Sequence, residues 1–118
     1  MRVNILGQDY TVEVKKYNED EAFKDRSIDG YCDWLTKEIV LCDMTTWPGW
    51  GKEPVRTVNL AHAQTLRHEI VHAFLYESGL GNSARQTNGP WAKNEEMVDW
   101  VASQGPKIYA AWREAGAL

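Results

Sequence analysis

The segment from Leu60 to Ser78 constrains the fold most strongly, because its apolar residues recur at the spacing of a single α-helix. Asn59 is typical of the residue that begins a helix, and Gly79 is typical of the residue that follows a helix end. The pattern therefore predicts one long helix over residues 60–78. The apolar stripe expected to face the core consists of Leu60, Ala63, Leu66, Ile70 and Phe74.

The same helix carries the motif H-E-x-x-H at His68, Glu69 and His72. At about 100° per residue, the two histidines lie about 40° apart on one face, opposite the apolar stripe. Two imidazoles one turn apart can bind one Zn²⁺, and Glu69 is well placed to take a proton from a water molecule at the ion. We therefore expect a zinc site with Glu69 as general base. His62 points about 120° away from His68 and is not expected to be a ligand.

A catalytic zinc site takes three protein ligands, and the second predicted helix supplies carboxylates for the third. This helix should begin at Pro90 and run from Trp91 to about Ser103, with the three acidic residues Glu95, Glu96 and Asp99. Glu95 and Asp99 are four residues apart and share a face, whereas Glu96 points about 100° away from Glu95. We expect Glu95 as the ligand and Asp99 as the partner that orients a ligating histidine. The competing assignment exchanges the roles of Glu95 and Asp99.

The two segments HEIVH and NEEMVD together resemble the motif pair of the gluzincins, in which H-E-x-x-H is followed by N-E-x-x-x-D on a second helix. Asn94, Glu95 and Asp99 match the second motif, and the resemblance covers about residues 60–103. The chain is similar to small phage- or prophage-encoded metallopeptidases and to the ImmA/IrrE-like family. This resemblance implies a zincin-like α+β fold, with a small twisted sheet packed on the H-E-x-x-H helix. It also implies an edge strand that pairs with an extended substrate, for which 38–42 is the candidate.

The remaining elements are predicted from alternation, turn residues and helix breakers. We expect strands at 3–6 and 10–14 in one hairpin, strands at 31–35 and 38–42 in another, and a short helix within 18–26. Residues 43–54 should form a loop and 79–89 a polar return loop. Gly105 and Pro106 should end the second helix, before a final short helix at 107–115. With 118 residues, the chain is expected to form a single domain over 1–118.

Composition narrows the function classes. The net charge of −4 argues against a general nucleic-acid-binding surface, which needs clustered lysine and arginine. The sequence has no apolar run long enough to span a membrane and no recognisable signal peptide, so a cytoplasmic location without membrane association is expected. Cys32 and Cys42 do not form a C-x-x-C motif and are expected to be free thiols.

The sequence thus favours a zinc-dependent metallopeptidase acting on a peptide or protein substrate. Tyr76 and Tyr109 are candidates for an oxyanion donor, although a structural role is favoured for each. Trp47 and Trp50 either wall a substrate pocket or anchor their loop on the core.

Two alternatives remain open. The first is a non-catalytic binding module stabilised by zinc, which Glu69 disfavours because a structural site needs no general base. The second is a metallohydrolase acting on a non-peptide amide. A DNA-associated protease is disfavoured by the acidic charge and by the absence of a zinc ribbon.

Overall fold

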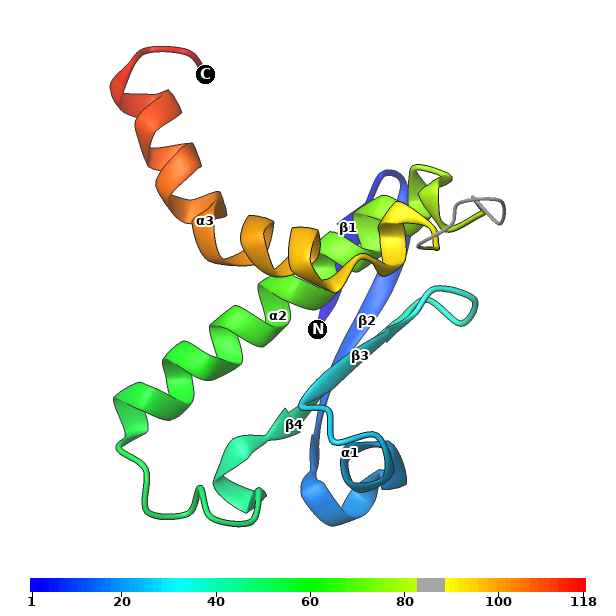
Figure 1. Ribbon diagram of the computed structural model, residues 1–118, viewed down its shortest axis with the longest axis vertical. Coiled ribbons are helices and arrows are strands. Elements are labelled where there is room, and N and C mark those ends of the chain that lie inside the picture. Colours follow the sequence, from blue (N-terminus) through cyan, green and yellow to red (C-terminus); the bar gives the residue numbers. More distant parts are fainter. Residues whose placement is uncertain (83–88) are drawn as a thin grey trace.

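The computed structural model describes residues 1–82 and 89–118, and these residues form the predicted α+β fold (Figure 1). A four-stranded mixed sheet packs against the long helix α2, and a second long helix, α3, crosses α2. The strands are β1 (Arg2–Ile5), β2 (Gln8–Lys16), β3 (Gly30–Asp33) and β4 (Glu38–Asp43). The long helices are α2 (Val55–Glu77) and α3 (Glu95–Glu114), and the short helix α1 spans Glu21–Asp25. Single 3₁₀ turns lie at Tyr17–Glu19 (η1), Met44–Thr46 (η2), Leu80–Asn82 (η3) and Trp91–Lys93 (η4).

Both predicted hairpins are present, but the predicted edge strand is wrong. β1 pairs with β2 and β3 pairs with β4, each antiparallel, while β2 and β4 pair in parallel. The strand order is therefore β1-β2-β4-β3, which places β4 in the interior of the sheet and β3 at its edge. Residues 38–42, expected to form the edge strand, already have a hydrogen-bonded neighbour on each side, so they have no free edge for another strand.

Helix α2 begins five residues earlier than predicted. Pro54, rather than Asn59, is the N-cap, and the carbonyl of Pro54 accepts a hydrogen bond from the N–H of Val58. Proline is tolerated there because it has no N–H to be left unpaired at the start of a helix. The predicted end is confirmed: the helix stops at Glu77, and Gly79 follows with a φ of +86°, a conformation that favours glycine.

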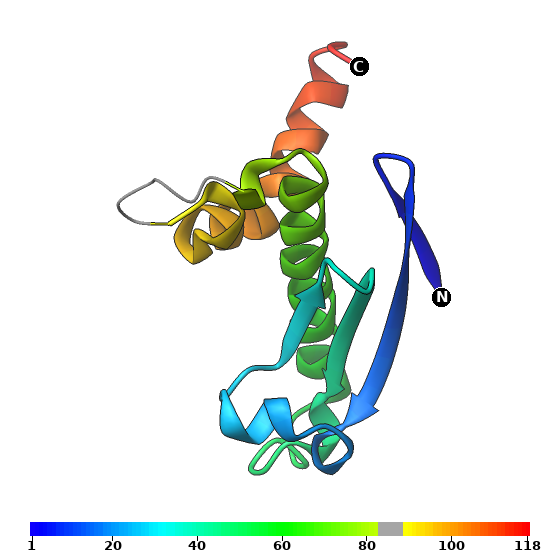
Figure 2. The ribbon, with the colours of Figure 1, turned by 90° about the vertical axis from the view of Figure 1, so that its right-hand side faces the viewer.

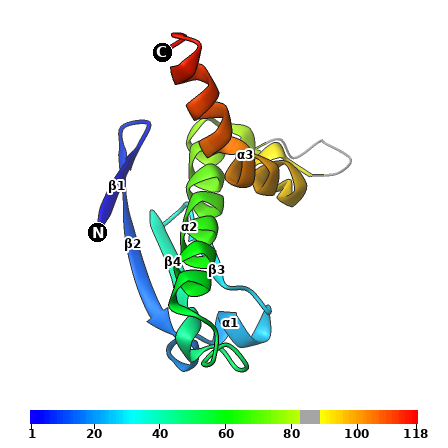
Figure 3. The same cartoon turned by 90° about the vertical axis from the view of Figure 1, so that its left-hand side faces the viewer.

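The buried side of α2 is rotated relative to the predicted apolar stripe. Ala73 is fully buried and Leu66 and Ile70 pack beside it, but Leu60 and Phe74 are exposed. Phe74 follows Ala73 and so points about 100° away from it. Two layers cover α2, the sheet on one side and the η4–α3 segment on another (Figure 3). His72 and Glu69 are both buried although they lie outside the predicted apolar stripe, and the carbonyl of Ala92 in η4 lies against the ring of His72.

Helix α3 begins at a different residue from the one predicted. The N-cap is Asn94, whose side chain accepts a hydrogen bond from the N–H of Met97, and Pro90 instead precedes the separate turn η4. This cap places Glu95 in the first turn of α3, where a carboxylate interacts favourably with the helix dipole.

Helix α3 also continues through Gly105 and Pro106, so the predicted break and the separate final helix are wrong. Proline at 106 leaves the carbonyl of residue 102 without its helical donor. That carbonyl, on the buried Ala102, accepts a hydrogen bond of 2.8 Å from Nε of Arg67 on α2. The side chain of one long helix thus replaces the hydrogen bond that the other has lost. The C-terminal half of α3 then projects away from the sheet (Figure 1).

The core lies between the sheet and α2 and divides into two clusters. One joins Ile5, Tyr10, Ile39, Leu41 and Ala73, and the other joins Phe23, Val40, Cys42 and Met44. The close approach of β3 to α2 depends on Gly30, because a Cβ at that position would lie 2.9 Å from Cγ2 of Thr65 on the helix. Figure 2 shows β3 running alongside α2.

Two further expectations concern the return loop and the membrane. Of the predicted loop at 79–89, residues 80–82 form the turn η3, and the part at 83–88 lies outside the described residues.

Among the helices of the described residues, none has the combined length and apolar character needed to cross a bilayer.

Candidate metal centre

Helix α2 brings His68, Glu69 and His72 together as a group that can hold a metal ion. One side-chain ligand atom from each residue lies within 4.8 Å of the others. Glu69 is only 5% exposed and His72 only 7% exposed, which is unusual for polar side chains of this kind. His62, on the same helix, is not part of the group, in agreement with the direction expected for it.

The ring of His72 is held by a backbone carbonyl. Its Nδ1 lies 2.5 Å from the carbonyl oxygen of Ala92, in the turn η4. A carbonyl oxygen can only accept a hydrogen bond, so Nδ1 must carry the proton. Neutral His72 therefore presents the lone pair of Nε2 to the site.

The ring of His68 is held in the same orientation by a carboxylate. Its Nδ1 lies 2.6 Å from Oδ1 of Asp99 on α3. Donation from Nδ1 to Asp99 leaves the lone pair of Nε2 free, as it is in His72. A carboxylate that receives the outer N–H of a histidine is a frequent companion of metal-ligating histidines.

The two Nε2 atoms converge on each other and on Glu95. They are 3.0 Å apart, and each lies 3.0 Å from an oxygen of the Glu95 carboxylate. Two lone pairs and a carboxylate at this separation repel one another unless a proton or a metal cation lies between them. In a tetrahedral zinc site with bonds of 2.0–2.1 Å, neighbouring ligand atoms are about 3.3 Å apart. The side chains of His68, His72 and Glu95 therefore fit a zinc ion with only a small expansion.

Two carboxylates are thus close to the histidines, and their surroundings differ. An oxygen of Glu69 lies 3.9 Å from Nε2 of His68, farther away than the oxygens of Glu95. The Glu95 side chain is 65% exposed, whereas that of Glu69 is 6% exposed. We therefore treat Glu95 as the geometrically better third ligand, with Glu69 beside the three.

Burial gives Glu69 an altered acidity. Loss of water around its carboxylate raises its pKa to about 7, an effect that His68 opposes and the charge of Glu95 reinforces. A carboxylate with a pKa in this range can accept and release a proton near neutral pH, which is what a general base must do.

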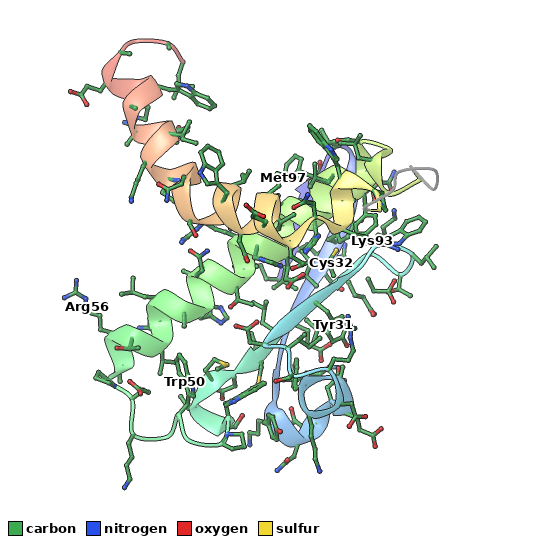
Figure 4. All side chains as sticks on the ribbon, viewed as in Figure 1. Tyr31, Cys32, Trp50, Arg56, Lys93 and Met97 are labelled. Carbon is green, nitrogen blue, oxygen red and sulfur yellow. The ribbon has the colours of Figure 1, made fainter. Side chains whose placement is uncertain are left out.

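The histidines and both glutamates line one cavity of about 870 Å³. Strand β3 forms one wall, and α2 with the η4–α3 segment forms the other. Tyr31 and Cys32 on β3 and Lys93 on η4 lie along this opening (Figure 4). The edge of the sheet that β3 forms thus borders the candidate metal centre.

Other residues singled out in the sequence lie away from the cavity. Glu96 does not line this cavity and instead lines a separate groove with Asp99 and Trp100. Trp47 and Trp50 pack against the second core cluster, so they anchor their loop and do not line this cavity. Figure 4 shows Trp50 far from Lys93 and Cys32. Cys32 and Cys42 are free thiols, as expected.

Two features of the site were missed from the sequence. The carbonyl of Ala92 carries no residue-specific signal, because every residue has one. The role of β3 as the bordering strand had a signal: the continuous apolar run Ile39–Cys42 is typical of a central strand with both faces covered, which leaves β3 at the edge.

The chain matches no protein family profile, and no curated protein or solved structure gives a significant match.

Proposed function

We propose that this protein is a zinc-dependent metallopeptidase of the gluzincin type. The observation that carries the proposal is the convergence of two histidine lone pairs and the Glu95 carboxylate beside a buried glutamate, Glu69, in an open cavity. A structural zinc site is normally closed by four protein ligands, whereas a catalytic site keeps one position open. Three converging ligands at a cavity fit the second description.

The proposed role of each residue in the reaction follows from its surroundings in the structure. Bound zinc would lower the pKa of a water molecule and polarise the scissile carbonyl. His68, His72 and Glu95 would hold the ion, while Asp99 and the carbonyl of Ala92 fix the two rings. Glu69, buried beside them, takes the proton of the attacking water.

The reaction balances with Glu69 as the only proton carrier. The water oxygen bonds to the carbonyl carbon, and the π electrons of the carbonyl move onto its oxygen. Collapse of this species breaks the C–N bond, and the electron pair goes to nitrogen. Nitrogen then takes the proton that Glu69 received, so the base is regenerated.

The substrate favoured by the cavity wall is an extended peptide. On the side away from β4, β3 has no strand partner among the described residues, and it borders the cavity. An extended chain can add to such an edge through backbone hydrogen bonds, which do not depend on its sequence. This geometry favours a peptide or protein substrate over a small non-peptide amide.

The proposal is tested by peptide-library cleavage before and after treatment with a chelator, and after zinc is restored. Glu69→Gln should retain zinc and lose activity by about 10²–10⁴-fold, because it removes the base and keeps the side-chain size. Glu96→Gln is the matched control and should cleave like the wild type, since Glu96 lies outside the cavity.

Three results would refute the proposal: a zinc-loaded wild type that cleaves no peptide, cleavage that survives complete removal of metal, or a Glu69→Gln protein with full activity. The first would favour the zinc-stabilised binding module or a hydrolase acting on a non-peptide amide.

A further inference from the structure

The face of α2 that carries the two histidines also carries Tyr76, one helical turn further along. His68, His72 and Tyr76 are spaced four residues apart, so they form one row along the helix. The ring centroid of Tyr76 lies 6.4 Å from that of His72. Tyr76 also lines the same cavity as His68, Glu69, His72 and Glu95. Tyr76 thus forms part of the cavity wall next to the candidate metal centre.

The ring of Tyr76 is fixed by its neighbours. It stacks on Trp34, with ring centroids 5.5 Å apart and planes 12° apart. It also packs against Gly81, where a Cβ would overlap Cδ1 of the tyrosine ring. Glycine at 81 therefore allows the turn after α2 to close onto the ring. A side chain held in this way is preorganised, and a donor needs this property to stabilise developing charge.

The hydroxyl of Tyr76 differs from those of two nearby tyrosines. Tyr10 donates to Glu77 at 2.7 Å, and Tyr31 donates to Asp20 at 2.6 Å, so both hydroxyls are engaged. Within residues 1–82 and 89–118, no acceptor for the Tyr76 hydroxyl is found.

The surroundings of Tyr76 also keep its hydroxyl protonated. Burial raises its pKa, and the charges of Cys32, Glu95 and Glu69 reinforce the effect. The hydroxyl therefore keeps its proton and remains a hydrogen-bond donor.

We propose that the Tyr76 hydroxyl is the oxyanion donor of the peptidase reaction. The inference rests on the proposed function. As water adds to the scissile carbonyl and its π electrons move onto oxygen, the Tyr76 hydroxyl donates a hydrogen bond to that oxygen. No proton is transferred from the tyrosine, and when the C–N bond breaks the hydrogen bond returns to ground-state strength. The donor thus stabilises the transition state more than the substrate.

Other donors are less well suited. Tyr109, on the projecting half of α3, is 53% exposed and does not line the cavity. Arg26 and Lys93 line the cavity, but both are exposed, and neither forms an ion pair with any residue in 1–82 or 89–118. A flexible, hydrated cation must be ordered during the reaction, whereas the ring of Tyr76 is already held.

Tyr76→Phe tests the inference, because it removes the hydroxyl and keeps the ring stacked on Trp34. Tyr109→Phe is the matched control. For zinc-loaded proteins, we expect Tyr76→Phe to lower kcat by about 10²–10³-fold, with KM changed less than about twofold. A peptide phosphonamidate, whose tetrahedral phosphoryl group mimics the transition state, should bind at least about tenfold more weakly to this variant. Zinc content and melting temperature should equal those of the wild type, and Tyr109→Phe should change nothing.

The outcomes separate the two proposals. A wild type that cleaves peptides, with a Tyr76→Phe variant of equal kcat and equal phosphonamidate affinity, would overturn the role of Tyr76 alone. A variant with raised KM and unchanged kcat would also overturn it, because the hydroxyl would then bind the ground state. A wild type that cleaves no peptide would overturn both proposals.

Discussion

At the scale of single residues, the candidate centre depends on what holds the outer nitrogens of two histidines. The carbonyl of Ala92 and the carboxylate of Asp99 each accept from Nδ1, so both Nε2 atoms face inward and each offers a lone pair in the neutral form of the histidine. The two acceptors differ in chemistry. Asp99 can be removed by substitution, whereas the Ala92 carbonyl can only be moved by displacing η4.

Zinc titration of three single variants tests these roles. Glu95→Ala should lose zinc affinity most, because it removes a ligand. Asp99→Ala should lose about 10–100-fold, because the ring of His68 is no longer oriented. Glu96→Ala is the control and should bind zinc like the wild type, since Glu96 does not line the cavity that holds the two histidines. Weaker binding by Asp99→Ala than by Glu95→Ala would reverse the assignment, and a Glu96→Ala protein that cannot hold zinc would exclude the proposed register.

Sequence spacing predicts best which residues share one face of a helix, because that depends on the geometry of the helix alone. Glu95 and Asp99 share a face of α3 because four residues make about one turn, and once α3 packs on α2 both contact His68. The burial of Glu69 was not predictable in this way. It depends on the elements that pack around α2, among them β3, which lines the same cavity, and such tertiary contacts are not encoded by local spacing.

At the scale of elements, the local pairings were predictable and the non-local one was not. Each hairpin joins strands that are close in sequence, so turn residues and alternation reveal it. The parallel pairing of β2 with β4 joins residues 11–16 to residues 38–43 and has no such local signal. This pairing decides which strand lies at the edge, and the error about residues 38–42 follows from it.

The failure of Pro106 to end α3 has a similar tertiary cause, and it can be tested by a double-mutant cycle. Arg67→Ala should lower the free energy of unfolding by about 1–3 kcal/mol, because it leaves the buried carbonyl of Ala102 without a donor. Pro106→Ala restores a helical N–H for that carbonyl. Arg67→Ala should therefore cost less in the Pro106→Ala background.

Urea unfolding of the four proteins measures this coupling. Loss of the packing of the Arg67 side chain is common to both backgrounds, so it cancels in the cycle. An equal cost of Arg67→Ala in both backgrounds would contradict the compensating role of Arg67.

At the scale of the whole molecule, one carboxylate connects the sheet to the end of α2, the helix that carries the candidate metal centre. Glu77, the last residue of α2, accepts hydrogen bonds from Tyr10 on β2 and from Lys37 in the turn between β3 and β4. The hydrogen bond from Lys37, and then that from Tyr10, lower the pKa of Glu77 below its ordinary value of 4.5. The ionised form is thus favoured in the folded state.

The sign of the resulting pH dependence follows from linkage. A carboxyl with a lower pKa when folded contributes stability above pH 4.5, and this contribution is lost as the pH falls through the folded-state pKa. Glu77→Gln should therefore be less stable than the wild type at neutral pH, and the difference should shrink on acidification below pH 4.5.

Thermal unfolding of the metal-free proteins across this range, with the exposed Glu13→Gln as control, measures the effect. The metal-free form is used because acid also releases zinc from histidines. A difference between wild type and Glu77→Gln that stays constant down to strongly acid pH would contradict the account.

The central claim is that two helices hold one zinc ion through three named side chains. Anomalous diffraction at the zinc absorption edge, from crystals of the zinc-loaded protein, tests it most directly. The account predicts one peak per chain, about 2.0–2.1 Å from Nε2 of His68 and of His72 and about 2.0–2.2 Å from a carboxylate oxygen of Glu95. The absence of a peak at that position, or a zinc ion bound without His68 and His72, would contradict it.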